Sequence, residues 1–571
     1  MVTTANRSTV WGASIIDAVV AGGVELAYIL PGSRSTPLVI AATAHDRLQT
    51  ETLHDERVAA FAALGHAKRT GVPAAVICTS GTAGGNMLPA VIEARYDPTP
   101  MVVITADRPP GLHGTGANQT IDQSELLSPY VRARGTTPMP VADADVVAAT
   151  VDAVTQLVAS AGTATAGPVH LNVPFAKPLT PSVPDDSPAE DLGVLNAAPP
   201  QPPDPAASDG VDKAALRRVA SSLEGRRVLI IAGPMAPWQP DRAAIATLAR
   251  RTDAPLLADP LSGLRTGSHV TDTAVIGAYD AICAAEATPS PPDVVLRFGA
   301  SPTSAALQQY LGGLTVPQVM ITPAERGNDP LQVADEQLIG SPGTVAAMLC
   351  AQLPTTHPYA AAWAEPAALA DMQLRGATQA GAGVVIQAVD EQLRDDAALV
   401  IGSSMPIREF DRYGTVHPRT RLVVANRGAS GIDGLVSTAV GVARSQPTTL
   451  VLGDVSLIHD IGGLLAIDRV GVDLTVVCLN DDGGGIFQML PIAAIDPPFT
   501  EYFRTPHGLS FAAAAQLFDL SYENVTSQEF RSVFTPPASG DGGRLIEVTL
   551  GAALTHTERD AAVDAIGRTP R

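Results

Sequence analysis

Two acidic side chains follow two apolar segments in the last third of the chain. Asp454 comes after the run from Thr449 to Leu452 and a glycine, and Asp481 comes after the run from Leu474 to Leu479 and an asparagine. Short apolar runs bounded by small residues predict buried strands, so each carboxylate is expected at the end of a strand. Hard divalent cations such as Mg²⁺ take oxygen ligands and commonly bridge one or two protein carboxylates to the phosphates of a ligand. These residue types in these places therefore predict a site for a metal ion and a diphosphate.

The interval between the two carboxylates supports the same interpretation. It is long enough for a crossover helix, through Gly462 to Ile467, and a return to a neighbouring parallel strand. Both loops would then open at the same edge of one sheet. Either loop alone is also explained by an ordinary turn of an α/β domain, but the pair at this spacing favours a metal and diphosphate site.

The two segments resemble the cofactor motif of the thiamine diphosphate-dependent decarboxylase and synthase superfamily. The superfamily usually has Gly-Asp-Gly and an Asn-Asn pair, and this chain has Gly453-Asp454-Val455-Ser456 and Asn480-Asp481-Asp482-Gly483-Gly484-Gly485-Ile486-Phe487. The resemblance implies thiamine diphosphate with Mg²⁺ or Mn²⁺ as cofactors, and it implies that Asp454, Asp481 and the carbonyl of Gly483 hold the metal. Val455 replaces a glycine. Asp481 replaces an asparagine, which keeps an oxygen ligand and adds charge.

The length of 571 residues is too great for one core and predicts about three domains. Strand and helix patterns alternate, and with the resemblance they predict an α/β fold of three doubly wound parallel-sheet domains. The predicted divisions are a pyrimidine-binding domain at 1–180, a Pro-rich linker at 181–211, a central Rossmann-like domain at 212–355 and a C-terminal domain for diphosphate and metal at 366–571. The break before the last domain is expected between Gln352 and Pro366.

Apolar runs also predict strands in the first two domains. The predicted strands are Leu26–Leu30, Ala74–Cys78, Met101–Thr105, Val169–Val173, Arg227–Ala232, Pro255–Ala258, Val294–Phe298 and Gln318–Ile321. The turn after the first central strand, from Ala232 to Pro237, lacks the glycine spacing of a dinucleotide fingerprint. We therefore expect no nicotinamide or flavin in the central domain.

Composition limits the class of protein further. The four cysteines are far apart in the sequence and form no CxxC, which argues against a disulfide framework and a thiolate zinc site and favours a reducing cytoplasm. No apolar run reaches the length of a membrane span. The net charge of −21 disfavours binding to nucleic acid or anionic membranes. An acidic surface with few lysines fits a protein of a high-salt cytoplasm. A GC-rich genome, which favours arginine codons over lysine codons, is the alternative explanation for the scarcity of lysine.

Glu56 begins a small-residue helical segment, from Val58 to Ala67, after His54 and Asp55. A carboxylate at a helix N-terminus ordinarily compensates the helix dipole. The segment, however, resembles the activating-glutamate element of the superfamily. That resemblance implies that the Glu56 carboxyl shares a proton with N1′ of the cofactor's aminopyrimidine, and we expect burial to favour this role.

Arginines occur in four loops at predicted strand ends. Arg34, Arg108, Arg408 and Arg427 lie in these loops. Any one of them is readily explained as a solvated surface residue. Four in loops that converge on one cofactor predict binding of a polyanionic substrate, because guanidinium groups bind carboxylates in a planar bidentate fashion.

The same loops resemble a menaquinone-pathway branch of the superfamily, in which 2-oxoglutarate is decarboxylated and its succinyl unit is added to isochorismate. The resemblance rests on Pro31-Gly32-Ser33-Arg34-Ser35, Gly114-Thr115-Gly116-Ala117-Asn118-Gln119-Thr120, Asn426-Arg427-Gly428-Ala429-Ser430-Gly431-Ile432-Asp433-Gly434 and the loop ending at Phe487. This branch also tolerates a residue other than glycine at Val455. The central stretch from Arg297 to Ser304 lacks a basic pair that some members have.

The resemblance to this branch implies a role for each of these loop residues. Substrate binding is implied for Ser33, Arg34, Arg108, Asn118, Gln119, Arg408, Arg427 and Phe487. Cofactor binding is implied for Glu56, Ser404, Ile432, Gly453, Asp454, Val455, Ser456, Asp481, Gly483 and Ile486.

Members of the superfamily place the cofactor between two chains, so a homodimer or homotetramer in the cytoplasm is implied. Two alternatives stay open. One is another thiamine diphosphate carboligase or decarboxylase, similar to acetolactate synthase, and the other is a non-catalytic paralogue that acts as a binding protein.

Overall fold

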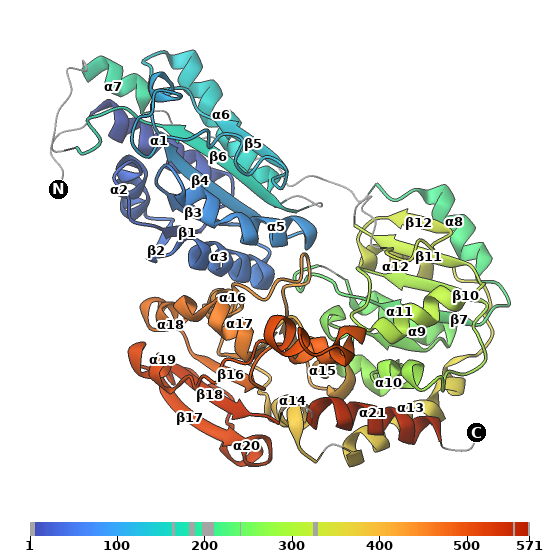
Figure 1. Cartoon of the computed structure of the whole chain (residues 1–571). Coiled ribbons are helices and arrows are strands. Elements are labelled where there is room, and N and C mark those ends of the chain that lie inside the picture. The colour runs from blue at the N-terminus through green and yellow to red at the C-terminus, as the bar shows by residue number, and fades with distance from the viewer. Residues whose placement is uncertain are drawn as a thin grey trace. The chain divides into compact units, whose positions relative to one another are not determined.

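The computed structural model describes residues 6–162, 166–181, 189–196, 210–239, 241–323, 329–377, 379–551 and 554–568. The chain divides into two compact units. The first comprises residues 1–207, 426–445 and 459–472, and the second comprises 208–425, 446–458 and 473–571. Three six-stranded sheets underlie these units (Figure 1). The predicted α/β fold with three parallel sheets is confirmed, and the exact domain boundaries stay predictions.

The first unit contains the N-terminal sheet, in which all neighbouring strands are parallel. Its strands are β1 (Leu26–Ile29), β2 (Gln49–Thr52), β3 (Ala74–Cys78), β4 (Met101–Asp107), β5 (Ala133–Thr136) and β6 (Pro168–Pro174). The spatial order is β2-β1-β3-β4-β6-β5. The order reverses between β1 and β3, and in open α/β sheets ligands bind beyond the carboxyl ends of the strands at such a switch point.

Helices cover both faces of this sheet. They are α1 (Arg7–Ala21), α2 (Thr36–Ala44), α3 (Glu56–Thr70), α4 (Ala83–Asn86), α5 (Leu88–Tyr96), α6 (Ala144–Ser160) and α7 (Ala189–Leu195), with the 3₁₀ turn η1 (Pro110–Leu112). The helices α1, α2, α6 and α7 share one hydrophobic core with alternate residues of the central strands, such as Ile29, Ile77 and Ile104. Figure 1 shows α3 and α5 on the opposite face.

Two helices from the last third of the chain also belong to the first unit. They are α16 (Leu435–Ala443) and α18 (Leu464–Val470), the second preceded by the turn η4 (Ile461–Gly463). Glycines allow α16 to pack closely on α3: a Cβ on Gly65 would lie 1.9 Å from the carbonyl oxygen of Thr438, and one on Gly441 would lie 2.0 Å from that of Ala62. The loop before α16 is therefore attached to the N-terminal sheet's own helices.

The second unit contains the central sheet and the C-terminal sheet. The central strands are β7 (Val228–Ala232), β8 (Leu256–Ala258), β9 (Val275–Ile276), β10 (Val294–Phe298), β11 (Gln318–Thr322) and β12 (Glu336–Ile339). They lie in the order β12-β11-β10-β7-β8-β9, which is the Rossmann order with its reversal between β7 and β10. The helices and turns around this sheet are α8 (Lys213–Ser222), α9 (Ala243–Thr252), η2 (Pro260–Ser262), η3 (Ser268–Thr271), α10 (Tyr279–Ala284), α11 (Ala305–Gly313) and α12 (Pro342–Cys350).

The C-terminal sheet repeats the strand order of the N-terminal one. Its strands are β13 (Ala398–Ile401), β14 (Leu422–Val424), β15 (Thr448–Gly453), β16 (Leu474–Asn480), β17 (Ser521–Thr526) and β18 (Gly543–Thr549), in the order β14-β13-β15-β16-β18-β17. All of these neighbours are parallel. The remaining elements of the second unit are α13 (Ala360–Ala377), α14 (Gly381–Gln392), α15 (Met405–Tyr413), α17 (Asp454–His459), η5 (Gly485–Met489), η6 (Pro491–Ala494), η7 (Thr500–Arg504), α19 (Ala512–Leu517), α20 (Ser527–Val533) and α21 (Leu554–Gly567).

One continuous hydrophobic core runs from the central sheet to the C-terminal sheet. It includes Leu229 and Ile231 of β7, Trp363 of α13 and Leu399 of β13, all fully or almost fully buried. Burial of apolar surface on this scale is the dominant favourable term in folding. The two sheets therefore form one compact unit.

The predicted strands are confirmed to within about two residues at each end. The predicted linker differs from expectation, because residues 189–195 form α7, which packs on α1. The Ser14 hydroxyl donates to the Leu195 carbonyl at 2.6 Å, and Arg7 pairs with Asp191 at 3.3 Å. The proline run at 199–205 lies outside the described residues. The second predicted break is shorter than expected, because α13 already begins at Ala360 and contains Pro366.

All four cysteines are free thiols, as their spacing predicted. Among the described residues, no helix has both the length and the apolar character needed to cross a membrane.

Candidate active site

The two predicted metal-binding carboxylates lie at the ends of adjacent parallel strands. Asp454 follows β15 directly, and Asp481 follows β16, with Thr448 to Gly453 paired in register with Leu474 to Leu479. The sheet order reverses between β13 and β15, so Asp454 stands at the switch point of the C-terminal sheet. The predicted crossover and shared edge are confirmed.

Asp454 is 2% exposed, and both of its oxygens accept hydrogen bonds. Oδ1 accepts from its neighbour's backbone N–H, that of Val455, at 2.7 Å. Oδ2 accepts from the N–H of Gly483 at 2.8 Å and lies 3.0 Å from Nε2 of His507. His507 Nδ1 accepts the N–H of Leu509 at 3.0 Å, which leaves the proton of a neutral ring on Nε2, directed at Asp454. A buried carboxylate needs such donors to remain charged.

Asp481 is less well compensated. Burial raises its pKa to about 6, the charge of Asp454 contributes in the same direction, and Arg504 opposes both. Arg504 donates through Nη2 to the Asp481 carbonyl, and its Nη1 lies 3.7 Å from the carboxylate. Gly485 leaves room for this side chain, since a Cβ there would lie 2.0 Å from Asp481 Oδ2.

These features fit a divalent cation. Asp454 is buried and Asp481 is half-buried, and their carboxylates repel each other. A cation bound to both would remove that repulsion. Within the described parts of the chain, no three His, Cys, Asp or Glu side chains converge as a complete metal site. A pair of carboxylates fits an ion that takes its other oxygens from phosphate and water, as Mg²⁺ does.

The loop after β13 lies on the other side of the switch point. Ser404 has a φ of +71°, which is strained for a residue with a Cβ. Such strain persists only where the surroundings impose it and is common at ligand sites. Ser404 precedes α15, and its carbonyl accepts from Nη1 of Arg408 at 2.7 Å. Beside it, a Cβ on Gly453 would meet no atom within 4 Å, so this turn faces open space.

Buried ion pairs hold α15 in place. Arg412 pairs with Asp280 of the central sheet's α10 at 2.6 Å, and Glu409 pairs with Arg559 of α21 at 2.9 Å. Asp411 accepts from Arg265 at 2.7 Å. Burial raises the pKa of Asp411 to about 7, although Arg265 opposes that change. The central sheet thus fixes the helix whose first turns carry two predicted ligand-binding residues.

The segment after Gly485 contributes aromatic side chains. Phe487 and Phe503 meet edge to face with their ring centres 5.8 Å apart, and Phe503 stacks on Phe499 at 6.4 Å. Ile486 and Phe487 are half-buried. Both follow Asp481 within six positions of the chain.

The first unit carries the other predicted residues. Glu56 is the first residue of α3, which Asp55 caps by accepting the N–H groups of Arg57 and Val58. The Glu56 side chain is half-buried rather than buried as expected, and it accepts from Asn86 Nδ2 at 3.3 Å. It follows β2, so it lies at the carboxyl edge of the N-terminal sheet.

Arg34 and Arg108 follow β1 and β4 at the same edge. Arg34 is 5% exposed, and it donates through Nη1 to the Phe175 carbonyl at 2.6 Å. Burial lowers the pKa of Arg34, and the charge of Arg108 adds to this effect. Among the described residues, the Nε atoms of both arginines are buried without a hydrogen-bond partner. Two nearby guanidinium groups with unused donors fit a carboxylate ligand. Ser33, beside them, is exposed.

The loop with Asn118 and Gln119 is anchored to the end of β3. Gln119 has a φ of +58°, and its Nε2 donates to the Ser80 carbonyl at 2.8 Å, while the Ser80 hydroxyl donates to the Gln119 carbonyl at 3.0 Å. Gln123 accepts the Gly81 N–H at 3.0 Å. Asn118 itself is exposed.

Arg427 and Ile432 lie in the loop that leads into α16 of the first unit. Arg427 is half-buried, and among the described residues its side chain has no hydrogen bond or ion pair. Ile432 is also half-buried. The predicted site residues thus fall into two groups, one on each unit. Most lie at sheet edges or in loops, but Arg408, predicted in a loop, lies in α15, because the helix begins directly after Ser404.

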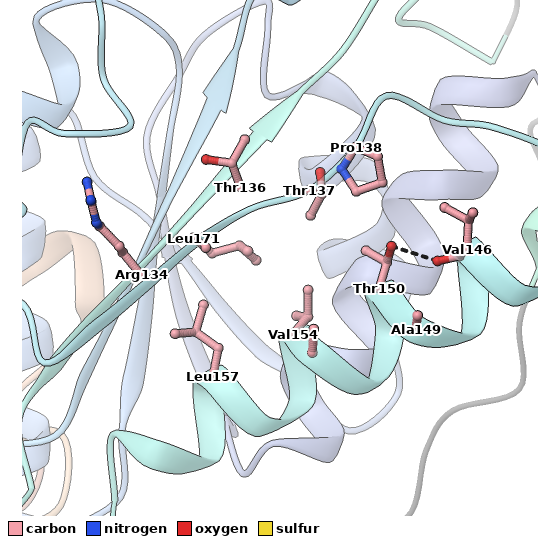
Figure 2. A pocket seen from close by; sticks show the side chains of 12 residues that line it. Arg134, Thr136, Thr137, Pro138, Val146, Ala149, Thr150, Val154, Leu157 and Leu171 are labelled. Carbon is pink, nitrogen blue, oxygen red and sulfur yellow. Dashed lines mark hydrogen bonds between the residues drawn. The ribbon is translucent and has the colours of Figure 1, made fainter.

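A separate groove of about 390 Å³ lies between α6 and β5 in the first unit. Figure 2 shows its aliphatic lining, which includes Val154, Leu157 and Leu171. None of the predicted site residues lines it.

Sequence reasoning missed His507 and Arg504. Both contact the carboxylate loops, yet they lie far along the chain from them, in a segment with no recognised motif. No local pattern distinguishes such residues from ordinary surface side chains.

Comparisons with known proteins agree with the fold and the motifs. Residues 10–126 match the family model described as thiamine pyrophosphate enzyme, N-terminal TPP binding domain. A solved chain from Mycobacterium smegmatis, described as thiamin diphosphate-dependent, has a TM-score of 0.68 at 16% identity and covers 95% of this chain and 99% of that one. The fold and the N-terminal domain are those of the thiamine diphosphate-dependent enzymes.

Curated relatives narrow the class to one family. Two of them, from Halobacterium salinarum and Natronomonas pharaonis, are 42% and 40% identical to this chain. The alignments cover 99% of this chain in both cases, and 99% and 100% of the relatives. A third, from Roseiflexus sp., is 38% identical over 97% of each chain. The chain belongs to the family of 2-succinyl-5-enolpyruvyl-6-hydroxy-3-cyclohexene-1-carboxylate synthases.

The raised pKa of Asp481 makes the stability of the cofactor-free protein depend on pH. The folded protein keeps the proton on Asp481 up to about pH 6, whereas an ordinary aspartate loses it near pH 3.8. Proton binding therefore contributes its full stabilisation of the folded state below pH 3.8, and this contribution is lost as the pH rises through about 6. Asp481→Asn removes the titrating group. From pH 5 to pH 7, its free energy of unfolding should rise by about 1 kcal/mol relative to wild type. Urea unfolding at the two pH values measures this difference, and parallel curves would contradict it.

Proposed function

We propose that this protein decarboxylates 2-oxoglutarate and adds the succinyl unit to isochorismate, which yields 2-succinyl-5-enolpyruvyl-6-hydroxy-3-cyclohexene-1-carboxylate for menaquinone biosynthesis. The products are this compound and CO₂. The full-length similarity to synthases of that name carries the proposal. The two carboxylate loops and the strand-end arginines agree with it. We place the reaction in the cytoplasm, where thiols stay reduced.

Asp454, Asp481 and the carbonyl of Gly483 would hold Mg²⁺ or Mn²⁺ together with the diphosphate. Ser404, Ile486 and the turn from Gly453 to Ser456 would contact the cofactor, and Ile432 would hold it in position. Thiamine diphosphate, when bound, supplies the electron sink that decarboxylation of a 2-oxo acid requires. The protein's contribution is to bind, orient and shield the reactants.

Glu56 would hold a proton against N1′ of the aminopyrimidine ring. Its place at the start of α3, at the sheet's carboxyl edge, leaves the carboxyl accessible from outside the single chain. A ligand that covered it would exclude water and strengthen the interaction. The Asn86 amide, already bonded to Glu56, would orient it.

The two substrates together carry four carboxylates, and the arginines would neutralise these negative charges. Arg34, Arg108, Arg408 and Arg427 would bind them, with Ser33, Asn118 and Gln119 bonding further substrate oxygens. The unused Nε donors of Arg34 and Arg108 and the unpaired Arg427 are consistent with this role within the described residues. Phe487 and its aromatic neighbours would keep water from the reacting carbon, because protonation there would divert the reaction.

We also propose that the active protein is a homodimer or homotetramer. Glu56 of one copy and Asp454 and Asp481 of another would bind the same cofactor. In the single chain, large apolar side chains are exposed in the segment after Gly485. Met489 is 50% exposed, Leu490 47%, Ile495 57% and Tyr502 68%. A cluster of exposed apolar residues in one segment is typical of an interaction surface.

The substrate assignment can be tested directly. Protein supplied with thiamine diphosphate, Mg²⁺ and 2-oxoglutarate should consume isochorismate, followed as loss of its ultraviolet absorbance and release of one CO₂ per molecule. Pyruvate in place of 2-oxoglutarate should give little turnover, because it lacks the second carboxylate. Turnover with pyruvate and none with isochorismate would indicate another carboligase. Cofactor binding without any turnover would indicate a binding protein.

Glu56→Gln should lower kcat by roughly 10²-fold to 10⁴-fold, the range for loss of a group that transfers a proton. Binding of thiamine diphosphate, measured by calorimetry, should change little, because the metal and diphosphate contacts lie elsewhere. Glu25→Gln is the matched control, since Glu25 is exposed at the amino end of β1. Unchanged turnover in Glu56→Gln would exclude this role.

Sedimentation equilibrium should give at least twice the chain mass of 58.7 kDa at micromolar concentration. Replacing the exposed Ile495 and Tyr502 with aspartate should shift the protein toward monomer and lower activity in parallel, because buried like charges oppose association. A fully active monomer would contradict the shared site.

A further inference from the structure

A buried glutamate in the first unit binds the backbone of the loop that carries Arg427 and Ile432. Glu93 lies on α5 and is 3% exposed. Its Oε1 accepts the N–H of Gly428 at 2.8 Å, and its Oε2 accepts the N–H of Ala429 at 2.7 Å and that of Ser430 at 3.3 Å. Three successive backbone donors therefore point at one carboxylate. The side chain lies more than 330 positions from them in the sequence.

The charge of Glu93 is balanced from the side of α3. Lys68 is 3% exposed, and its Nζ lies 3.5 Å from Glu93 Oε1 and also pairs with Asp97. Burial alone lowers the pKa of Lys68, but Asp97 and Glu93 outweigh burial and the net change is upward. A cation held in this way keeps the carboxylate ionised, and ionised acceptors form the stronger hydrogen bonds.

The loop fits closely on α5 at the same point. A Cβ on Gly428 would lie 2.4 Å from the Glu93 carbonyl oxygen and 2.6 Å from the Asp97 nitrogen. A pocket of about 230 Å³ next to this contact is lined among others by Phe61, Glu93 and Ala429. The hydrogen bonds to Glu93 add directed contacts to the close packing at Gly428.

From this geometry we infer that Glu93 is a positioning residue, which fixes the backbone of residues 428–430 and thereby aims Arg427 and Ile432 at the substrate and cofactor. Arg427 directly precedes the first bonded amide, and Ile432 follows the last one by two positions. The inference rests on the proposed function for the ligands that these two residues meet. The attachment of the loop is a property of the protein without ligands.

Glutamine cannot replace Glu93. Both oxygens of the carboxylate accept from N–H groups, whereas an amide has one accepting oxygen and an NH₂ group that would face another donor. Glu93→Gln would leave the N–H of at least one of these part-buried hydrogen bonds without an acceptor, which is unfavourable. The loop would then leave its position more often, while the helices on either side stay packed.

The first measurement needs neither cofactor nor substrate. Amide hydrogen exchange at residues 428–430 should be about tenfold faster in Glu93→Gln than in wild type, because at least one of these N–H groups has lost its acceptor and the loop opens more often. Glu51→Gln is the matched control. Glu51 pairs with Arg444, directly after α16, and so links the same helix to the N-terminal sheet without touching the loop. It should leave exchange at 428–430 unchanged.

The second measurement is kinetic. Glu93→Gln should raise, by about tenfold, the KM of the same substrate whose KM rises in Arg427→Gln, with a smaller change in kcat. The double variant should be little worse than Arg427→Gln alone, since both changes act through one side chain. Glu51→Gln should keep the wild-type constants.

The outcomes separate the two proposals. If exchange at 428–430 and both KM values stay at wild-type levels in Glu93→Gln, the positioning role is wrong even when wild type is fully active. If wild type does not use isochorismate, the proposed function is wrong, and the exchange experiment still decides whether Glu93 holds the loop. Should Glu93→Gln fail to fold, Gly428→Ala decides instead. It pushes the loop off α5 without touching the charges and should give the same faster exchange, and unchanged exchange would overturn the inference.

Discussion

Parallel strand pairing brings together two carboxylates, the buried Asp454 and the half-buried Asp481. Neighbouring parallel strands end at the same edge of the sheet, so the side chains that directly follow β15 and β16 lie close together. The resulting repulsion, together with burial, raises the pKa of Asp481. Much of the surrounding structure consists of donors to these two residues: the backbone of Val455 and Gly483, the ring of His507 and the guanidinium of Arg504. The pair fits a divalent cation, which agrees with the proposed metal and diphosphate site.

The central sheet supports this site without supplying a recognised ligand. It shares a continuous core with the C-terminal sheet, and its residues Arg265 and Asp280 form buried ion pairs with α15. Buried pairs add little net stability compared with apolar packing, but breaking one is costly because a charge is left unpaired. They therefore fix the orientation of α15 more than they strengthen the fold. The positions of Ser404 and Arg408, at the start of that helix, are fixed in the same way.

The N-terminal sheet has the same strand order as the C-terminal one, and both place their predicted functional residues at the carboxyl edge. In the first unit the edge carries Glu56, Arg34 and Arg108. The loop before α16 joins this unit through the glycine contacts between α3 and α16 and through Glu93. Residues from the last third of the chain thus become part of a unit built on the first third. Helices that are remote in sequence thus hold this loop in its position.

The sequence alone determined the strands that end at Asp454 and Asp481, the start of α3 at Glu56 and the membership of a superfamily, because these depend on local patterns of apolar and small residues. It placed Arg34, Arg108 and Arg427 correctly in loops after strands, but Arg408 lies in helix α15 and not in a loop. It did not indicate α7 inside the predicted linker, the half-exposed state of Glu56, or the roles of His507, Arg504 and Glu93. Each of these depends on contacts between residues far apart in the chain. Only tertiary packing decides which distant donor satisfies a buried carboxylate, because many side chains have the right chemistry and the fold brings one of them within 3 Å.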